Sequence, residues 1–241
     1  MRGALSVSIN ISEKKIKSKV KVGERVAVVE NIKYPYFESE NHKKLCSKMN
    51  EFYSYIAEKY SFHARSKLPK KIKLSRLTCK LPMTVSMNYT IALCSEKAVS
   101  VVLDLAFAEG KTFRTRRFSQ VWGIEKKDIL RTGEIINTDR KSIKKIYSQI
   151  CAVAKDNSEN PAFGYFDDYA KRLAKSFESE NCFLVPNGLC FFINAGVLSP
   201  IKYGANSFVL PFSKLDGIIK DDFFAKNAEK AAQNTDIVNN V

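Results

Sequence analysis

Alternating segments in the middle of the chain constrain its fold more than any other feature. In residues 84–93 and 99–107, apolar side chains occupy every second position, which is the period of a strand with one buried face. Residues 112–122 follow as a third strand, and the turns at 95–97 and 109–111 are short. Strands joined by such short turns pair antiparallel. The sequence therefore predicts an antiparallel meander.

Further strands and helices are expected on both sides of this meander. Alternation predicts earlier strands, at residues 5–11, 16–22 and 25–32. A turn is expected at 13–15, and Pro35 is expected to interrupt the strand pattern because proline cannot join a central ladder. Helical spacing predicts amphipathic helices, at about 39–60, after Thr138-Asp139 and after Asp167-Asp168. A pair of apolar strands is predicted over 183–193, with a short strand at 207–211.

This order of elements predicts an α+β fold, in which an antiparallel meander sheet packs against amphipathic helices in two associated parts. The 241 residues suffice for one large domain or two small ones. We expect a strand-helix part over 1–75 and an α+β part with the meander over 76–216. Residues 217–241 are expected to form a C-terminal helix, at about 221–233, and a frayed tail.

Positive charge is concentrated in the first part of the chain. Residues 1–150 hold 31 Lys and Arg against 14 Asp and Glu, whereas residues 151–241 hold 9 against 11. Within this region the densest basic patch comprises Arg65, Lys67, Lys70, Lys71, Lys73 and Arg76. Such a patch attracts an anionic polymer or an acidic protein, and nucleic acid is one candidate. The alternative is a solvated surface that keeps the protein soluble.

A second candidate site lies on the third strand of the meander. The period of two places Arg114, Arg116, Phe118 and Trp122 on one face. Arginines beside aromatic rings would suit an anionic or ring-shaped ligand. The alternative is a solvent-exposed face on which long side chains cover the rings.

The motifs of familiar enzymes are missing from the sequence. We find no G-x-S-x-G, H-E-x-x-H or G-x-G-x-x-G, and two histidines leave few general bases. The six cysteines are scattered without a C-x-x-C pair, which favours reduced thiols in the core over disulfides or zinc. We therefore expect no catalytic residues, no metal and no cofactor.

The N-terminus and the longest apolar runs bear on localisation. The first residues lack the apolar region of a secretory signal, and no apolar run approaches the roughly 18 residues that a membrane span needs. The sequence thus predicts a cytoplasmic protein without a transmembrane segment. A cell-envelope location is the alternative if an N-terminal anchor has been removed.

Two groups of residues resemble a bacterial domain family of unknown function. The C-terminal group is Phe183, Asn187-Gly188, Phe191-Phe192, Leu198-Ser199-Pro200, Gly204, Phe208-Val209-Leu210-Pro211-Phe212 and Leu215. The N-terminal group is Tyr34-Pro35-Tyr36-Phe37, followed by Met49-Asn50-Glu51-Phe52. The family is related to the extracytoplasmic sensor region of lysozyme-responsive anti-sigma factors and to the non-catalytic N-terminal region of some peptidoglycan deacetylases.

The resemblance implies a non-catalytic binding or sensor module of the cell envelope. Family members often carry a Gly-Gly-Ala-His run before the third meander strand, whereas this chain reads Ala-Phe-Ala-Glu-Gly at 106–110. A lysozyme-like partner is itself basic and fits poorly with a net charge of +15. We therefore expect a binding module of unknown ligand. The alternatives are a basic nucleic-acid-associated protein of the cytoplasm and an unrecognised enzyme.

Overall fold

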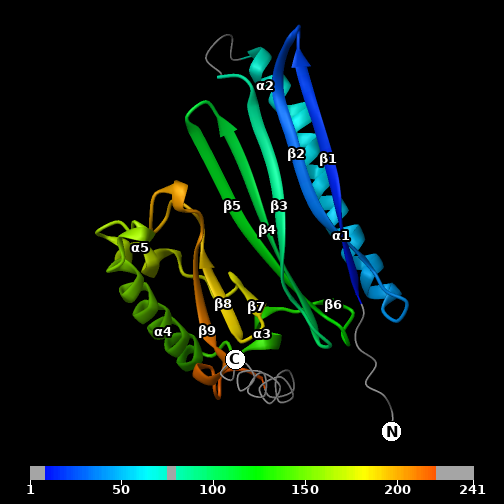
Figure 1. Ribbon diagram of the computed structural model, residues 1–241. Coiled ribbons are helices and arrows are strands. Elements are labelled where there is room, and N and C mark those ends of the chain that lie inside the picture. Colours follow the sequence, from blue (N-terminus) through cyan, green and yellow to red (C-terminus); the bar gives the residue numbers. More distant parts are fainter. Residues whose placement is uncertain (1–8, 75–79, 221–241) are drawn as a thin grey trace, which may run out of the picture. The chain divides into compact units, whose positions relative to one another are not determined.

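The computed structural model describes residues 9–74 and 80–220, and it confirms the α+β class (Figure 1). Its strands form a six-stranded sheet in the order β1-β2-β3-β4-β5-β6 and a separate three-stranded sheet in the order β7-β8-β9. The last strand of the first sheet, β6, is short (Asp128–Ile129). The chain divides into two compact units. Unit 1 comprises Met1–Thr90 with Val102–Phe118, and unit 2 comprises Ile91–Val101 with Ser119–Val241.

The two units differ from the parts expected at 1–75, 76–216 and 217–241, because three long strands contribute to both. These strands are β3 (Met83–Cys94), β4 (Ala98–Glu109) and β5 (Thr112–Gly123). Their alternating sequences form the predicted meander, with connections short enough to require antiparallel neighbours. The helix expected at 221–233 lies outside the described residues.

Unit 1 begins with a long hairpin of β1 (Asn10–Val22) and β2 (Arg25–Glu38). Gly23 adopts a φ of 62° in its turn, a conformation that glycine tolerates best. The turn expected at 13–15 is wrong, because these residues continue β1 and pair with Lys33–Pro35. The expected break at Pro35 is also wrong. Pairing of β2 with β3 runs from Val28 to Ile32, so Pro35 lies beyond it, where a missing N–H is tolerated.

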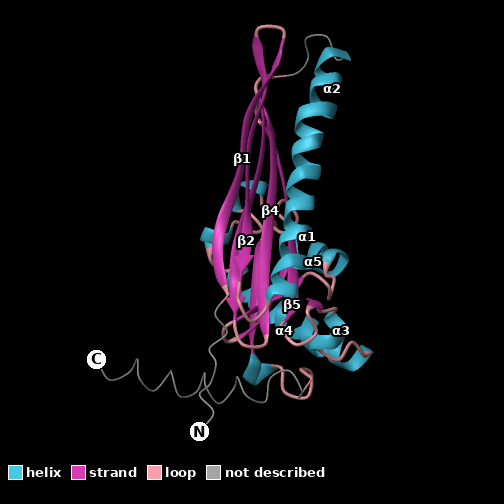
Figure 2. Cartoon of the chain, turned by 90° about the vertical axis from the view of Figure 1, so that its right-hand side faces the viewer, coloured by secondary structure: helices cyan, strands magenta, loops and turns pink. Residues whose placement is uncertain are grey.

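The pairing of β2 with β3 is parallel, so the sheet is mixed rather than wholly antiparallel. A parallel pair needs a crossover, and a long helical run supplies it. The run consists of α1 (Lys43–Phe62), the π-helical η1 (His63–Lys67) and α2 (Leu68–Leu74). It extends well beyond the expected 39–60 and lies along the strands of the hairpin (Figure 2).

Apolar side chains of the helical run and the sheet form the core of unit 1. One cluster joins Ala64 and Leu68 to Val28, Met83 and Val85. Nearer the start of α1, the Tyr53 ring packs 5.9 Å from the Phe37 ring. These strand residues alternate with polar ones because only one face of the sheet meets the helix.

Unit 2 contains the long helix α4 and several short helical elements besides its sheet. They are α3 (Thr132–Ile135), α4 (Arg140–Ser158), η2 (Pro161–Phe163), α5 (Tyr169–Ser176), η3 (Ile201–Tyr203) and η4 (Phe212–Lys214). The predicted start of α4 is confirmed, since the Asp139 carboxylate accepts hydrogen bonds from the backbone N–H groups of Lys141 and Ser142. Asp168 precedes α5, but its carboxylate accepts from Arg172 at 2.6 Å.

The second sheet has β8 (Gly188–Ile193) between β7 (Cys182–Val185) and β9 (Asn206–Pro211). Every residue of β8 is buried. Apolar residues of α4, such as Ile146 and Ile150, share its core with Val121 of β5, and α4 lies beside β9 in Figure 1. A Cβ on Gly188 would come within 2.2 Å of the Leu210 carbonyl oxygen, so glycine allows this close approach of β8 to β9.

Candidate binding surfaces

A row of exposed positive charge follows one face of β1. Lys15, Lys17, Lys19 and Lys21 occupy alternate positions and are all exposed, whereas the residues between them are half-buried. A strand directs alternate side chains to opposite faces, so these four lysines share one face. Lys33 of β2 pairs with Lys15 and joins them. We call these five residues the lysine face.

One glutamate partly compensates the lysine face. The Glu13 carboxylate lies 2.7 Å from Lys15 Nζ and 4.0 Å from Lys33 Nζ. The hydrogen bond from Lys15 lowers the pKa of Glu13, and the same bond raises the pKa of Lys15. Both groups are therefore charged at neutral pH, and one negative charge opposes five positive charges. The far end of the row, at Lys19 and Lys21, lies away from this pairing.

The inner strands beside the lysine face add neutral polar groups. Asn31 of β2 pairs with Lys17 on one side and with Ser86 of β3 on the other. Val29 likewise lies between Lys19 and Thr84. Paired residues project to the same face of a sheet, so small uncharged side chains continue the surface. The arrangement can attract an extended anion at Lys19 and Lys21, which lie away from the Glu13 carboxylate.

Sequence reasoning missed this row because it searched for the highest density of basic residues. The signal was present as Lys-x-Lys-x-Lys-x-Lys over 15–21, a period of two inside an alternating strand. The expected turn at 13–15 concealed it, because a turn would have separated Lys15 from the residues that follow.

The basic patch predicted from the sequence lies on η1 and α2. Arg65, Lys67 and Lys70 are exposed. Lys71 and Lys73 lie in α2, and Arg76 lies outside the described residues. The predicted basic patch is thus divided between two helical segments, whereas four of the five residues of the lysine face lie on a single strand.

Arg65 also has a structural partner. Its Nε donates to Glu30 Oε2 at 2.8 Å, and the Ser18 hydroxyl donates to the same oxygen. Burial raises the pKa of Glu30, but hydrogen bonds from Ser18, Ser61 and Arg65 outweigh burial and hold that pKa below its ordinary value. Glu30 is therefore an ionised carboxylate that links the helical run to the hairpin, and Arg65 is its ion-pair partner.

The residues predicted on β5 do not form one exposed set. Arg114 and Arg116 are exposed, and the Arg116 guanidinium lies 4.8 Å from the centre of the Phe118 ring. Trp122 is 2% exposed, so its ring cannot stack on a ligand. It also belongs to unit 2, whereas the other three residues belong to unit 1. Arg114, Arg116 and Phe118 are what remains of this candidate site.

Arg117, on the opposite face of β5, is engaged with β4. Its Nε and Nη2 donate to the two carboxylate oxygens of Asp104, each at 2.8 Å. Leu105 and Phe107 pack towards the helical core. Alternation along β4 and β5 therefore places the Arg117–Asp104 pair on the face away from α1.

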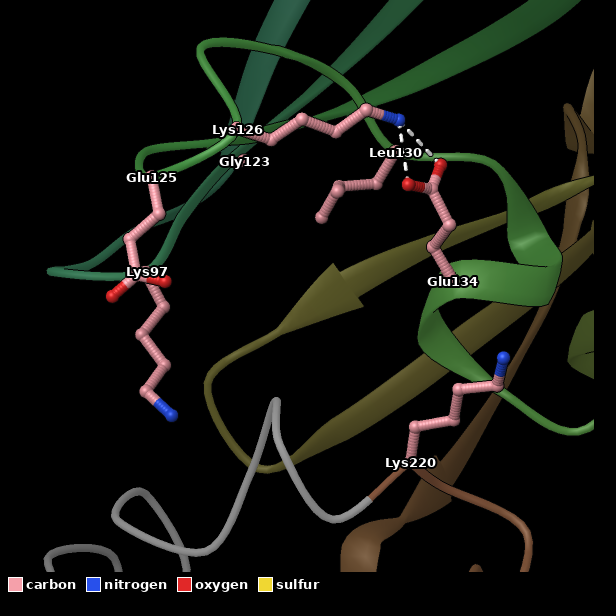
Figure 3. Close-up of a pocket in the computed structure, with 7 residues that line it drawn as sticks. All are labelled: Lys97, Gly123, Glu125, Lys126, Leu130, Glu134 and Lys220. Carbon is pink, nitrogen blue, oxygen red and sulfur yellow. Dashed lines mark hydrogen bonds and ion pairs between the residues drawn. The ribbon is translucent and has the colours of Figure 1, made fainter.

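Unit 2 contains a charged cavity of about 490 Å³ (Figure 3). Lysines from three segments line it, Lys97, Lys126 and Lys220, together with Glu125 and Glu134. The Lys126 ammonium donates to both carboxylate oxygens of Glu134 at 2.6 Å. Positive and negative charges thus partly neutralise one another in this cavity, whereas the lysine face is mainly positive.

Thiols and potential metal ligands do not define a reactive centre in the described chain. The cysteines at 46, 94, 151, 182 and 190 are reduced thiols, and Cys79 lies outside the described residues. Burial raises the pKa of Cys182 to about 12, which disfavours the nucleophilic thiolate. Over residues 9–74 and 80–220, no three His, Cys, Asp or Glu side chains gather as potential metal ligands.

The residues that carried the family resemblance have structural roles. Asn50 clamps the backbone of Phe37, accepting from its N–H at 2.8 Å and donating to its carbonyl at 2.9 Å. In unit 2, the Asn187 carbonyl accepts from Phe212 N–H, and Asn206 donates to Ser199 in a buried pair. These motifs therefore specify the fold rather than a ligand.

The fold of this chain is similar to that of two bacterial α+β proteins of known structure. A DUF3298 family protein of Bacteroides fragilis has a crystal structure that superposes with a TM-score of 0.62 at 9% identity, covering 88% of this chain and 94% of that one. A DUF3298 family protein of Pseudomonas aeruginosa PAO1 gives 0.59 at 12% identity, with 89% and 97% covered.

Neither protein is named as an enzyme, and at these identities the likeness shows the fold alone. No protein-family model matches the sequence, and no curated protein matches it. Among the helices of the described residues, none has the length and apolar character needed to cross a bilayer.

Proposed function

We propose that the protein is a non-catalytic binding module that holds an elongated polyanion along the lysine face. The observation that carries the proposal is the row of four exposed lysines on one side of β1, extended by Lys33. Successive lysines on one face of a strand are about 6.5–7 Å apart, so the row spans about 20 Å. That length suits a chain of regularly spaced charges better than a single small anion.

Charge rather than base recognition is the expected basis of binding. The inner strands contribute Asn31, Thr84 and Ser86 beside the row, and these side chains offer no aromatic platform for stacked bases. A polymer without bases should therefore bind as well as nucleic acid of similar charge. The resemblance to envelope sensor regions supports a recognition role, with a wall or surface polymer as the natural class of polyanion.

The test compares two triple variants with the same change in charge. One is Lys17→Gln/Lys19→Gln/Lys21→Gln on the lysine face. The matched control is Lys141→Gln/Lys155→Gln/Lys175→Gln, which alters exposed lysines of unit 2. Binding of a labelled single-stranded DNA oligonucleotide, used as a general polyanion, is followed by fluorescence anisotropy across a salt series, with heparin as the competitor without bases.

We expect the lysine-face variant to lose at least tenfold in affinity, with a salt slope reduced by about 0.7 per lost contact. The control should bind like the wild type, and heparin should displace the DNA completely. Failure of heparin to compete would favour the nucleic-acid alternative. Equal losses in both variants, or no binding at low salt, would overturn the proposal and leave the lysines as protection of an exposed sheet edge.

A further inference from the structure

The outer side of β1 is an open strand edge. β1 is the first strand in the order of its sheet and pairs with β2 on one side only (Figure 1). In an antiparallel pair, every second residue directs its N–H and C=O groups away from the neighbouring strand. Within residues 9–74 and 80–220, no backbone hydrogen bond reaches these outward groups of β1. A sheet edge of this kind can accept a further strand.

The open edge is long and regular. β1 has 13 residues, whereas a strand of about 5–6 residues is usual. Its pairing with β2 is continuous from Asn10 to Val20, and a register shift follows. Val20 pairs with Val28, the next residue of β1 pairs with Val26, and Ala27 is left over. The extra residue thus lies on the inner strand, so the outer edge of β1 stays extended.

The two faces of this edge differ in chemistry. The four β1 lysines of the lysine face project to one side. Ile16, Val20 and Val22 project to the other side, where they pack against core clusters of unit 1 but remain half-buried. An added strand would therefore meet positive charge on one face and partly exposed apolar groups on the other. Because its own side chains also alternate, the matching sequence alternates acidic and apolar residues.

The lysines also disfavour other strands at this edge. Antiparallel pairing with β1 of a second copy would bring the lysines of both copies to one face, where like charges repel. Edge lysines protect many sheets from uncontrolled pairing in this way. The same charges attract a strand of opposite charge, so the edge is selective rather than closed.

We propose that the open edge of β1 binds an extended acidic segment of a partner protein, which joins the sheet as a further strand. Backbone hydrogen bonds hold the segment along the edge, and its carboxylates lie beside the lysines. This inference goes beyond the polyanion proposal because it uses the backbone of β1. It shares with that proposal only the charge of the lysines.

The test uses a heptapeptide of alternating Glu and Val with blocked ends, whose four glutamates match the four lysines of β1. A block peptide, with the four glutamates followed by the three valines, has the same composition and charge without the alternation. Two further peptides carry backbone N-methyl groups, one on the glutamates and the other on the valines. Only one of these two sets of N–H groups can face β1 in a paired strand.

Calorimetry measures the affinity of each peptide, and NMR measures hydrogen exchange of the β1 amides with and without peptide. We expect the alternating peptide to bind about tenfold more tightly than the block peptide, since only the alternating peptide matches both faces. Methylation of one set should weaken binding about tenfold or more through lost hydrogen bonds, and methylation of the other set should not. The outward amides of β1 should exchange more slowly in the complex.

The triple variant Lys17→Gln/Lys19→Gln/Lys21→Gln should lose peptide binding, and its matched control in unit 2 should retain it. Equal binding of the alternating and block peptides, or equal losses from both methylated sets, would overturn the inference. A wild-type dimer that the peptide fails to dissociate, seen by analytical ultracentrifugation, would assign the edge to a second copy and also overturn it. Heparin should bind without slowing exchange of the edge amides. Heparin binding with no peptide binding would therefore refute the strand addition alone, and the reverse result would refute the polyanion proposal alone.

Discussion

The sheets of the two units differ in how far their faces are buried. In unit 1, the sheet packs one face on the helical run and presents lysines and small polar residues on the other. In unit 2, β8 is buried along its whole length, and the sheet shares a core with α4 and the end of β5. The comparison teaches that alternation in a strand leaves a face available for binding, whereas a continuous apolar run uses both faces for stability.

This difference also determines where each unit places its polar side chains. The open face of unit 1 offers charge along a strand, which is the basis for proposing an extended ligand. Unit 2 has no such face on β8, and its polar groups lie in the loops around the sheet, where they line compact pockets. The two units thus differ in where they expose polar side chains, along a strand in unit 1 and around compact pockets in unit 2.

The largest effect is expected from opening the enclosed sheet. Phe191 of β8 is 1% exposed, and its replacement in Phe191→Ala should cost about 3–5 kcal/mol because the neighbours cannot fill the cavity. Urea unfolding followed by the fluorescence of Trp122, the single tryptophan, reports on unit 2. The control Val209→Ala alters a 48%-exposed residue of β9 and should cost less than about 0.5 kcal/mol. Similar losses in both variants would contradict an enclosed β8.

A smaller effect is expected from the ion pair of unit 1, in which Glu30 is buried and Arg65 is exposed. Glu30→Gln should reduce the free energy of unfolding at neutral pH by about 1.5–3 kcal/mol, the contribution of a charged hydrogen bond. Because the folded-state pKa of Glu30 lies below its ordinary value of 4.5, the stabilisation is complete above that value. It is lost as the pH falls through the folded-state pKa.

Unfolding of wild type and variant between neutral and acid pH measures this contribution. The gap between them should close as the solution is acidified, since protonation removes the ionised partner from the wild type as well. Glu58→Gln, at an exposed position of α1, should change stability by less than about 0.5 kcal/mol at neutral pH. A gap that persists unchanged into acid would show that Glu30 stabilises by packing rather than by charge.

The smallest effect is expected on the open face. Asp104 is 43% exposed and Arg117 is 21% exposed, so water screens their pair. A double-mutant cycle of Arg117→Ala and Asp104→Ala should give a coupling free energy of about 0.2–1 kcal/mol, and salt should weaken it. Coupling well above that range, with no response to salt, would mean that this face is shielded from solvent.

Much of the fold was predictable because local patterns and tertiary packing agree. The meander, the start of α4 at Asp139 and the strand pair around 186–188 all follow from signals within a few residues. The prediction at Pro35 was wrong because a strand tolerates proline where its neighbour no longer pairs with it. The end of that pairing cannot be seen in the local sequence. The parallel pairing of β2 with β3 was hidden for the same reason.

The candidate sites were less predictable than the elements that carry them. Alternation placed Arg114, Arg116 and Phe118 on one face, but it could not show that Trp122 is buried in unit 2. Density of charge indicated the helical patch, although Arg65 is engaged with Glu30 and the longest ordered row lies on β1. In unit 2, a pocket of about 340 Å³ without charged lining residues brings together residues from 157 to 207, and the sequence offers no signal for that proximity.

The polypeptide passes between the units at three points, within β3, β4 and β5. Cleavage of the chain at a single position therefore cannot separate the two units, and neither unit is encoded by a continuous stretch of the gene. A truncation placed at any one of these points would interrupt strands that both halves require. The two units can therefore be expected to occur together, in keeping with the near-complete coverage of both solved structures of similar fold.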